Sequence, residues 1–490
     1  MPTGAALLNF WKLQKPARFL RVAAFGGLSL GLSGCIPGLE KPELSLEVPA
    51  SYRAAAKGDA DAAVPALAWW RGFRSPELTG LMESAQLYNL DIAVAIAQIV
   101  QADAQAGVSG AALLPSLSGS ANAERQHVAT GSSSSLGGGT TFSQFSLGLS
   151  ASYIVDFWGK NRATLSASEE SATVSRYNRE VVALTTMATV ANTYFQVLAA
   201  QDQIKVTRRN LAAAERILAL IKSQFAGGTA SQLDLSQQEA LVATQRAAIP
   251  PLEVTLGQNT AALAVLVARA PADFNVRGGS TTQIAVPRIT PGMPSELLYQ
   301  RPDVRQAEAQ LASSNFSVDA ARAAFFPQIQ LTGTTGFQSA ALVSLFAPGA
   351  WYYTLAAGLT QPLFDGFLLE SQFKLAKGQQ LQYLQAYRKA VLSAFADVEK
   401  ALIALQKYTL QERLQSEVVA ASRKAFEVAE TQLRGGTVNL ITVLQTQQTL
   451  FTAENNLVTV RLNKLLAASS LFQALGGGWT PAGTLAAAVQ

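Results

Sequence analysis

The sequence predicts a mixed fold of α-helices and transmembrane β-strands that is duplicated within one chain. Three observations indicate this fold. Residues 143–157 alternate apolar and small polar side chains, as a strand does when one face is apolar and the other meets water. Residues 160–226 then place apolar residues at heptad spacing with no proline, which predicts a long coiled-coil helix of roughly 100 Å. The same order of features returns about 210 residues later.

The first 34 residues predict a lipoprotein signal peptide. Basic residues precede a short apolar stretch, residues 22–32, which is too short to cross a bilayer as a helix. The stretch ends in Leu32-Ser33-Gly34-Cys35, which matches the lipobox of bacterial lipoproteins, so we expect cleavage before Cys35 and lipid attachment to it. A free thiol is the alternative. Ile36 follows where an Asp would retain the protein in the inner membrane, so the resemblance to the sorting pattern indicates the outer membrane.

Composition argues against several function classes. Removing the signal peptide lowers the formal net charge from +5 to +1, so the basic balance gives no support for a nucleic-acid partner. The only histidine, His127, has no second His or Cys near it in the sequence, and we expect no metal site there. No phosphate-binding loop, nucleophile elbow or pair of catalytic carboxylates stands out, so we expect neither an enzyme nor a bound cofactor.

The expected division of the chain follows from these patterns. It consists of a signal peptide 1–34, an extended N-terminal segment or linker 35–68, a first repeat 69–270, a linker and equatorial region 271–294, a second repeat 295–475 and a C-terminal tail 476–490. Each repeat contains a helix, two strands, a long helix, a turn and a return path. The strands are expected at 113–125, 143–157, 325–337 and 352–364, and the long helices at 160–226 and 367–434.

Two local signals refine the first repeat. Ser75 followed by Pro76 is typical of a helix start, and an alanine-rich helix is expected from there to about Gly107. Pro250 and Pro251 are expected to break or sharply bend the return path, because proline lacks the N–H and clashes with the preceding turn.

Four matched features indicate the duplication. Asn89-Leu90-Asp91-Ile92 corresponds to Arg301-Pro302-Asp303-Val304 at a spacing of 212 residues, and Pro115 corresponds to Pro327 at the same spacing. The heptad positions Val174, Val181, Ala188 and Phe195 return at a spacing of 210 as Leu384, Val391, Val398 and Leu405. Gly227-Gly228-Thr229 returns at 208 as Gly435-Gly436-Thr437. One match alone is weak, but four in the same order predict a tandem duplication.

Four strands cannot close a membrane barrel alone. Bacterial barrels have at least eight strands, because open edges are not tolerated in lipid. A symmetric oligomer can share the task, and a trimer supplies twelve strands. The polar alternate residues would line the lumen, namely Ser146, Ser150, Gln328, Gln330, Thr332 and Thr334. Two aromatic girdles are also expected, with Phe157, Trp158, Phe325, Phe326 and Phe364 at one end of the strands and Trp351, Tyr352 and Tyr353 at the other.

Three runs carry a resemblance to a known family. They are residues 69–73 (Trp-Trp-Arg-Gly-Phe), residues 300–311, which contain the specific Arg301-Pro302-Asp303-Val304, and residues 321–327. The sequence resembles the NodT branch of TolC/OprM-type outer-membrane efflux lipoproteins of RND systems over nearly the whole mature chain. The chain departs from the usual pattern at Phe367-Leu368, where the family has Gly-Arg. It departs again at Asn439, where the family often has Asp, which argues against a strong acidic ring at that level.

The resemblance implies a homotrimer in the outer membrane of a Gram-negative bacterium. Its twelve strands would form the barrel and its helices a periplasmic α-barrel. It further implies a passive conduit for drugs or other small molecules, which an inner-membrane RND-type pump supplies through a periplasmic adaptor protein. Outer-membrane lipid would surround the barrel.

The two glycine-rich turns are expected at the periplasmic tip, in contact with the adaptor. The residues concerned are Gly227, Gly228, Thr229 and Ser231 in the first turn and Gly435, Gly436, Thr437 and Asn439 in the second. Asp234 and Thr442 follow the turns and are candidate gate residues. For Asp234, a helix-start charge that the helix dipole favours is an equal alternative.

Two other functions stay open at this point. A secretion or heavy-metal export conduit would have the same architecture, because a wide polar lumen discriminates little between cargoes. A lipid-anchored periplasmic coiled-coil tether would explain the heptads and Cys35, but it leaves the alternating strands without a use.

Overall fold

The structure, a computed structural model, describes residues 67–128, 140–288 and 294–477, together with Pro49, Tyr52, Arg53, Gly292 and Trp479. All of them belong to one compact unit, Glu43–Gln490. The predicted signal peptide, Cys35, most of segment 35–68, the loop joining the first two strands and most of the C-terminal tail lie outside the described residues.

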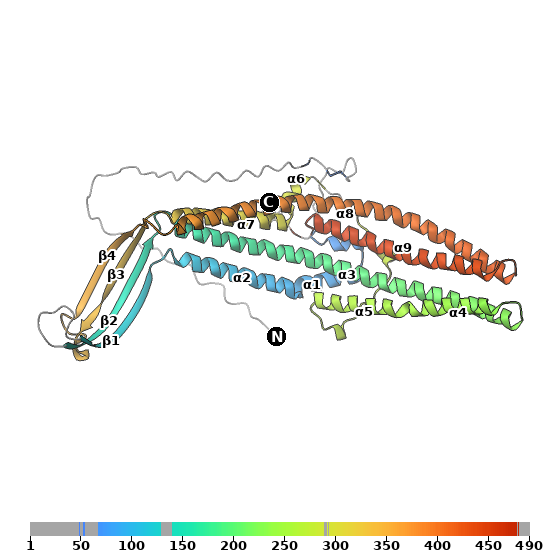
Figure 1. Cartoon of the computed structure of the whole chain (residues 1–490), viewed down its shortest axis with the longest axis horizontal. Helices are drawn as coiled ribbons and strands as arrows, with labels where there is room; N and C mark the ends of the chain where they lie inside the picture. The colour runs from blue at the N-terminus through green and yellow to red at the C-terminus, as the bar shows by residue number, and fades with distance from the viewer. Residues whose placement is uncertain are drawn as a thin grey trace, which may run out of the picture. The chain divides into compact units, whose positions relative to one another are not determined.

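The elements follow the same order in both halves of the chain (Figure 1). The first half contains η1 (Trp69–Phe73), α1 (Pro76–Tyr88), α2 (Leu90–Ala111), β1 (Ser116–Val128), β2 (Thr140–Val155), α3 (Lys160–Ala226), α4 (Gln232–Ala247) and α5 (Ile249–Leu266). Two short turns follow, η2 (Pro271–Asp273) and η3 (Thr281–Gln283). The second half contains α6 (Pro294–Gln300), α7 (Pro302–Ala323), β3 (Gln328–Ser339), η4 (Leu342–Ser344), β4 (Trp351–Thr360), α8 (Leu368–Arg434) and α9 (Leu440–Ala474).

The long helices α3 and α8 each contain 67 residues, and α3 covers the residues predicted for it. The strands differ more from expectation. β1 and β3 both begin immediately after a proline, Pro115 and Pro327, and therefore three residues later than predicted, because proline cannot donate to the ladder. β4 ends at Thr360, before Pro362, instead of continuing to residue 364.

The single helix predicted from Pro76 to about Gly107 is wrong. Asn89, with ψ of 130°, interrupts it and separates α1 from α2. Its side-chain oxygen accepts hydrogen bonds from the N–H groups of Asp91 (2.9 Å) and Ile92 (3.1 Å), so Asn89 caps α2. The second repeat has the same break, where Arg301 separates α6 from α7.

The proline pair breaks the first return path without a sharp bend. Pro250 and Pro251 lie in the first turn of α5, where their missing N–H groups leave no partner unsatisfied. The backbone at Ala248, between α4 and α5, keeps a helical φ of −74° and ψ of −15°. The two helices therefore continue along α3 in the same direction (Figure 1).

The four strands form one antiparallel sheet in the order β1-β2-β3-β4, so the two repeats join where β2 pairs with β3. Directly paired residues of an antiparallel sheet lie on the same face. Ser118, Ser150, Thr334 and Thr354 pair in one row across the four strands, and Leu147, Phe337 and Trp351 pair in another. The sheet therefore has one polar and one apolar face.

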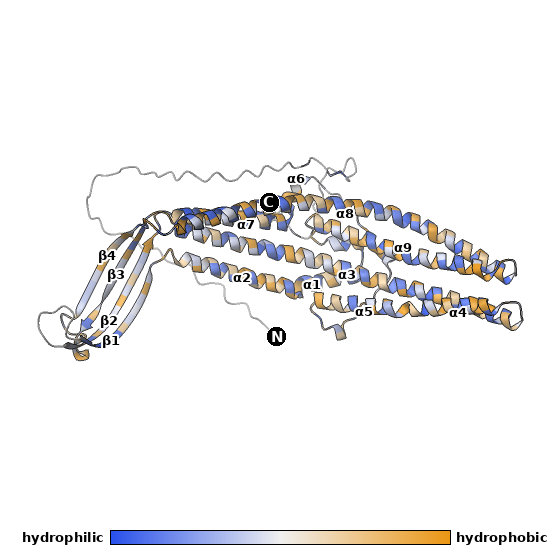
Figure 2. Ribbon diagram, viewed as in Figure 1, coloured by the Kyte–Doolittle hydropathy of each residue, from blue (hydrophilic) through white to orange (hydrophobic). Residues whose placement is uncertain are grey.

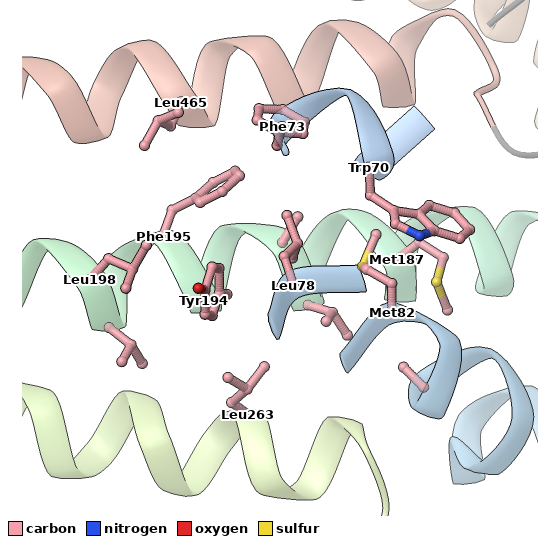
Figure 3. Packing of buried hydrophobic residues seen from close by; sticks show 14 of the residues in the cluster. Trp70, Phe73, Leu78, Met82, Met187, Tyr194, Phe195, Leu198, Leu263 and Leu465 are labelled. Carbon is pink, nitrogen blue, oxygen red and sulfur yellow. The ribbon is translucent and has the colours of Figure 1, made fainter. Parts of the chain in front are cut away.

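The aromatic run at residues 69–73 is a structural element of the core. It forms η1, whose Phe73 is fully buried and whose Trp69 ring stacks on Phe472 of α9 with centroids 4.9 Å apart. A Cβ on Gly72 would lie 2.9 Å from the Cβ of Pro287, so the small residue permits this packing. Figure 3 shows the resulting cluster between α9, α3 and α5, with Phe195 of α3 beside Phe73.

By length and composition two helical stretches are apolar enough to cross a membrane, Pro76–Ala111 and Lys160–Ala226. In the second stretch 56% of the most apolar window is buried inside the protein, which indicates a core helix. In the first stretch 11% is buried, and the helix is broken at Asn89. We therefore place neither stretch in the membrane.

Candidate functional site

The two turns at the ends of the long helices have the same backbone geometry. Gly228 has φ of 72° and Gly436 has φ of 71°, in the left-handed region that side chains disfavour. Nothing lies within 4 Å of a Cβ built on either glycine, so the backbone and not packing requires glycine here. The N–H and hydroxyl of Thr229 donate to the carbonyl of Gln224, at 2.8 and 3.0 Å.

Thr437 repeats this pattern in the second turn. Its N–H and hydroxyl donate to the carbonyl of Gln432, at 2.9 and 3.1 Å. All eight residues predicted for the tip are exposed: Gly227, Gly228, Thr229, Ser231, Gly435, Gly436, Thr437 and Asn439. Their side chains and backbones are therefore free to meet a partner protein.

The candidate gate residues occupy matching positions in the caps that follow the turns. Ser231 Oγ accepts the N–H of Asp234 (3.1 Å), while the Asp234 carboxylate accepts the Ser231 N–H (2.9 Å) and hydroxyl (2.6 Å). Asn439 Oδ1 accepts the N–H (3.1 Å) and hydroxyl (2.9 Å) of Thr442. The hydrogen bonds from Ser231 lower the pKa of the Asp234 carboxyl below its ordinary value. Both residues thus have a helix-capping role, and their part in a gate stays a prediction.

The two tips share one hydrophobic core. It contains residues from α3, α8 and α9: Ala213, Ile217, Ile221, Phe426, Ala429, Leu433, Leu440, Val443, Leu450 and Phe451. Both turns lie at the same end of the helices, away from the sheet (Figure 1). Two fully buried amides, Gln238 of α4 and Gln447 of α9, lie beneath the tips, and only Gln238 donates a described hydrogen bond, to the Ala214 carbonyl at 2.8 Å. Heptad patterns did not predict these two amides, because such patterns select apolar residues.

The sheet brings together the six residues predicted to line a lumen. The pairs Ser150–Thr334, Ser152–Thr332 and Ile154–Gln330 place Ser150, Thr332, Thr334 and Gln330 on the polar face. Ser146, opposite Gln338, and Gln328, opposite Thr360, share it. The side chains on this face in the centre of the sheet are hydroxyls and amides, interrupted by Ile154.

One aromatic residue is not where the girdle prediction placed it. Tyr352 pairs with Gly336, which pairs with Gly148, so its side chain belongs to the polar face. Its hydroxyl lies 3.2 Å from where a Cβ on Gly148 would be. The apolar face retains Trp351 and Tyr353, with rings 5.2 Å apart. The alternation of side chains along a strand contained this signal.

At the junction of sheet and helices the other predicted girdle is partly assembled. The Trp158 ring stacks on Phe326, with centroids 4.7 Å apart, and Phe157 meets the edge of Trp158 at 4.8 Å. Trp158 Nε1 donates to the carbonyl of Pro327 at 2.8 Å, so this cluster ties the end of the first repeat's sheet to the start of β3.

The described residues contain no group of three or more His, Cys, Asp or Glu side chains that could hold a metal ion. His127 lies near the outer end of β1, where its Nδ1 is 2.7 Å from the Thr141 hydroxyl.

Comparisons with known proteins match most of the chain. A family model described as "Outer membrane efflux protein" matches residues 81–269 and 293–477. The pyoverdine export outer membrane protein OpmQ of Pseudomonas putida is 37% identical over 456 residues, which cover 92% of this chain and 96% of the relative. The toluene efflux pump outer membrane protein TtgC of another P. putida strain is 31% identical, over 94% of this chain and 95% of the relative.

A solved structure agrees with these relatives. The open state of the MtrE outer membrane channel of Neisseria gonorrhoeae superposes with a TM-score of 0.79 and 28% sequence identity, covering 90% of this chain and 98% of MtrE.

Proposed function

Since the chain belongs to the outer membrane efflux protein family, we propose that three copies of it form one duct, with twelve strands in the outer membrane and the helices around a periplasmic tunnel. The protein is located in the outer membrane and acts as the outer-membrane channel of an efflux system. The family, location and role predicted from the sequence are confirmed. The alternative of a coiled-coil tether is set aside, because it gives the sheet no function.

The observation that supports a trimer is the sheet, which has one polar face, one apolar face and two unpaired edges. Within the described residues β1 and β4 each pair on one side only. Unpaired strand edges are too costly in lipid to persist, because no water satisfies their N–H and C=O groups. Pairing β4 of one chain with β1 of the next satisfies both edges, and three sheets give twelve strands. The apolar face then meets lipid and the polar face lines the lumen.

The exposed tips are the surface proposed for the adaptor. Three chains present six similar turns, each with a threonine that closes the turn and a polar cap residue, Thr229 with Ser231 or Thr437 with Asn439. An adaptor with hairpins of its own can dock between such turns. The inner-membrane RND-type pump then delivers cargo through that adaptor, and small inward shifts of the same helices would close the pore.

The cargo is proposed to be selected by the pump and not by this duct. OpmQ is named for pyoverdine export and TtgC for toluene efflux, so relatives of this chain are named for different cargoes. The polar face presents neutral hydroxyl and amide side chains in the centre of the sheet, so it offers no charged group there that would select one class of small molecule. Drugs or other small molecules therefore fit the duct, and a secretion or metal-export cargo is the alternative.

Cys35 is proposed to anchor the mature N-terminus by lipid, on the strength of Leu32-Ser33-Gly34 ahead of it. Stable anchoring takes more than one signal, and inserted strands would supply the second. Intact-mass spectrometry of membrane-extracted protein should give a chain that starts at residue 35 with added acyl mass. An unmodified start elsewhere rules the lipid out.

The proposed function is tested by cross-linking in cells that also produce an RND-type pump and its periplasmic adaptor. Cysteines placed at Thr229 and Thr437 should cross-link to the adaptor, whereas a cysteine at Ser344, at the other end of the molecule, should not. The purified protein should also run as heat-resistant trimers and conduct ions in a planar bilayer. Monomers without conductance, or adaptor cross-links only from Ser344, would contradict the proposal.

A further inference from the structure

The end of the β3–β4 hairpin, residues 340–350, is unusually apolar for a loop between strands. Its sequence is Ala-Ala-Leu-Val-Ser-Leu-Phe-Ala-Pro-Gly-Ala. No Lys, Arg, Asp or Glu occurs between Arg322 and Asp365, so the whole second strand pair lacks charge. The first strand pair differs, because β1 contains Glu124 and Arg125. Water-exposed turns are normally rich in polar residues, and this segment, which we call the β3–β4 knuckle, is not.

Three of the four large apolar side chains of the knuckle are exposed, whereas Leu345 is buried. Leu342 is 65% exposed, Val343 is 96% exposed and Phe346 is 67% exposed. Figure 2 shows hydrophobic colour at this far end of the hairpin. Exposed apolar groups in such density mark a surface that another apolar phase covers.

The knuckle bends back onto one face of the sheet. The ring of Phe346 meets the ring of Phe337 edge to face, with centroids 5.3 Å apart. Phe337 pairs with Leu147 on one side and Trp351 on the other, so it belongs to the apolar face. Since Phe337 lies two residues before the end of β3, the knuckle continues the apolar face instead of covering the polar one.

Several polar groups of the knuckle bond to one another or to the adjoining Ser339. The hydroxyls of Ser339 and Ser344 are 2.7 Å apart, and the Ser344 hydroxyl donates to the carbonyl of Ala341 at 3.0 Å. Backbone N–H groups are also satisfied within the segment: Ser344 to Ala341, Leu345 to Leu342, Ala347 to Ser344 and Ala350 to Ala347, at 3.1 to 3.2 Å. Internal satisfaction of polar groups is the condition for placing backbone in an apolar medium.

We propose that the β3–β4 knuckle inserts Leu342, Val343 and Phe346 among the acyl chains at the outer surface of the membrane. The inference rests on the proposed function, in which the apolar face of the sheet meets lipid. The occupant is lipid because the knuckle is continuous with that face, carries no charge and bonds several of its polar groups internally. Three knuckles per trimer would fix the depth of the barrel at its outer end, where the first hairpin of each chain supplies charged residues.

The proposal can be tested with spin labels on the full-length protein in proteoliposomes of outer-membrane lipids. Val343→Cys carries the test label, and its high exposure means that the label disturbs little packing. Leu149→Cys, on the apolar face, and Ser150→Cys, on the polar face, are matched controls on adjacent residues of β2. Parent protein treated with the same reagent corrects for label on Cys35.

The expected result is a label at residue 343 that collides severalfold more often with oxygen than with a water-soluble nickel chelate, as the label at residue 149 does. If the label at 343 instead behaves like that at 150 while 149 and 150 still differ, the knuckle lies in water and the inference is overturned, but the proposed function stands. If 149 and 150 do not differ, the proposed orientation of the sheet fails, and the inference fails with it.

Discussion

Asn89 and Arg301 occupy matching positions in the two repeats and make the same kind of hydrogen bond with different side chains. Each residue stands immediately before the helix that leads to a strand pair, although only the Asn89 side chain caps its helix, and each also donates to the carbonyl group at the end of its own repeat's return helix. Asn89 Nδ2 donates to Leu266 at 2.9 Å, and Arg301 Nη1 donates to Ala474 at 3.1 Å. The duplication therefore preserved the geometry of this tie, while the side chain that makes it changed from an amide to a guanidinium.

The second repeat adds a charged network to that tie. Arg301 makes two hydrogen bonds to Asp303, at 2.6 and 2.9 Å, and lies 3.4 Å from Asp397 of α8. The guanidinium is nearly buried, with 10% of its side chain exposed, so its contacts meet little competition from water. The Arg-Pro-Asp-Val run thus joins α7, α8 and α9, which gives this motif a structural reason independent of cargo.

The repeats differ most where their surroundings differ. The first return path is broken at Ala248, whereas α9 continues for 35 residues. The first strand pair contains charged residues, whereas the second contains none. The turns at the tips, in contrast, have the same hydrogen bonds: the N–H and hydroxyl of Thr229 and of Thr437 each donate to the carbonyl five residues earlier. The two repeats are therefore alike at the tips and differ in charge at the sheet, which indicates that the two tips share one role while the two strand pairs have different surroundings.

The largest effect is expected from charge on the apolar face of either repeat. Leu149→Arg in β2 and Leu355→Arg in β4 should each cost about 2–4 kcal/mol of barrel stability if the positions lie near the bilayer centre. Ser150→Arg and Thr354→Arg, on the polar face, should cost less. Heat resistance of trimers measures the difference, and equal tolerance on both faces would remove the assignment of faces.

The next largest effect is expected from removing the hydrogen bonds of Arg301 or of Asn89. Arg301→Ala should lower the free energy of unfolding by about 2–3 kcal/mol, because it leaves two carboxylates and a helix-end carbonyl without their donor. Asn89→Ala, at the matched position, should cost about 1 kcal/mol, as the loss of a neutral cap does. Denaturant unfolding of the trimer measures both. Equal losses would mean that the charged network contributes nothing beyond the shared geometry.

The tips should respond alike in the two repeats. Gly228→Val and Gly436→Val should each cost about 1–2 kcal/mol, because a β-branched residue is strained at positive φ. The trimers should remain in the membrane, while efflux and cross-linking to the adaptor are lost. Gly228→Asn and Gly436→Asn are the controls, since asparagine tolerates the left-handed conformation. Undiminished efflux in both valine variants would show that the turns do not form the docking surface.

The smallest expected effect is a difference between the caps of α4 and α9 in how their stability depends on pH. The Asp234 pKa is lowered in the folded protein, so its capping contribution is present above the unfolded pKa and is lost as pH falls through the folded pKa. The Asn439–Thr442 cap has no titrating group. Hydrogen exchange at the start of α4 should therefore accelerate in acid relative to the start of α9, and Asp234→Asn should abolish that difference. An acid response that survives this substitution would assign the effect to another group.

The sequence by itself determined the elements whose signals are local. The long helices α3 and α8, the strands and the Gly-Gly-Thr turns could be predicted because each signal involves residues only a few positions apart. Side-chain direction repeats along a helix or strand, so heptads and alternation show which residues share a face. Two local signals were missed: the helix break at Asn89, whose counterpart Arg301 precedes a proline, and the polar placement of Tyr352, which follows from simple alternation. The two Gly-Gly-Thr turns lie where the sequence predicted them for the same reason, whereas the docking role of the turns and the gate role of Asp234 and Thr442 stay predictions.

Tertiary structure alone decided which distant residues meet. The pairing of β2 with β3 and the ties from Asn89 to Leu266 and from Arg301 to Asp397 depend on how far α3, α5 and α8 extend before they pack. The periodicity of one segment cannot encode these contacts, because each is the joint outcome of several segments burying their apolar faces at once. The physical reason is that packing is a property of pairs of surfaces, whereas a sequence pattern describes one surface at a time.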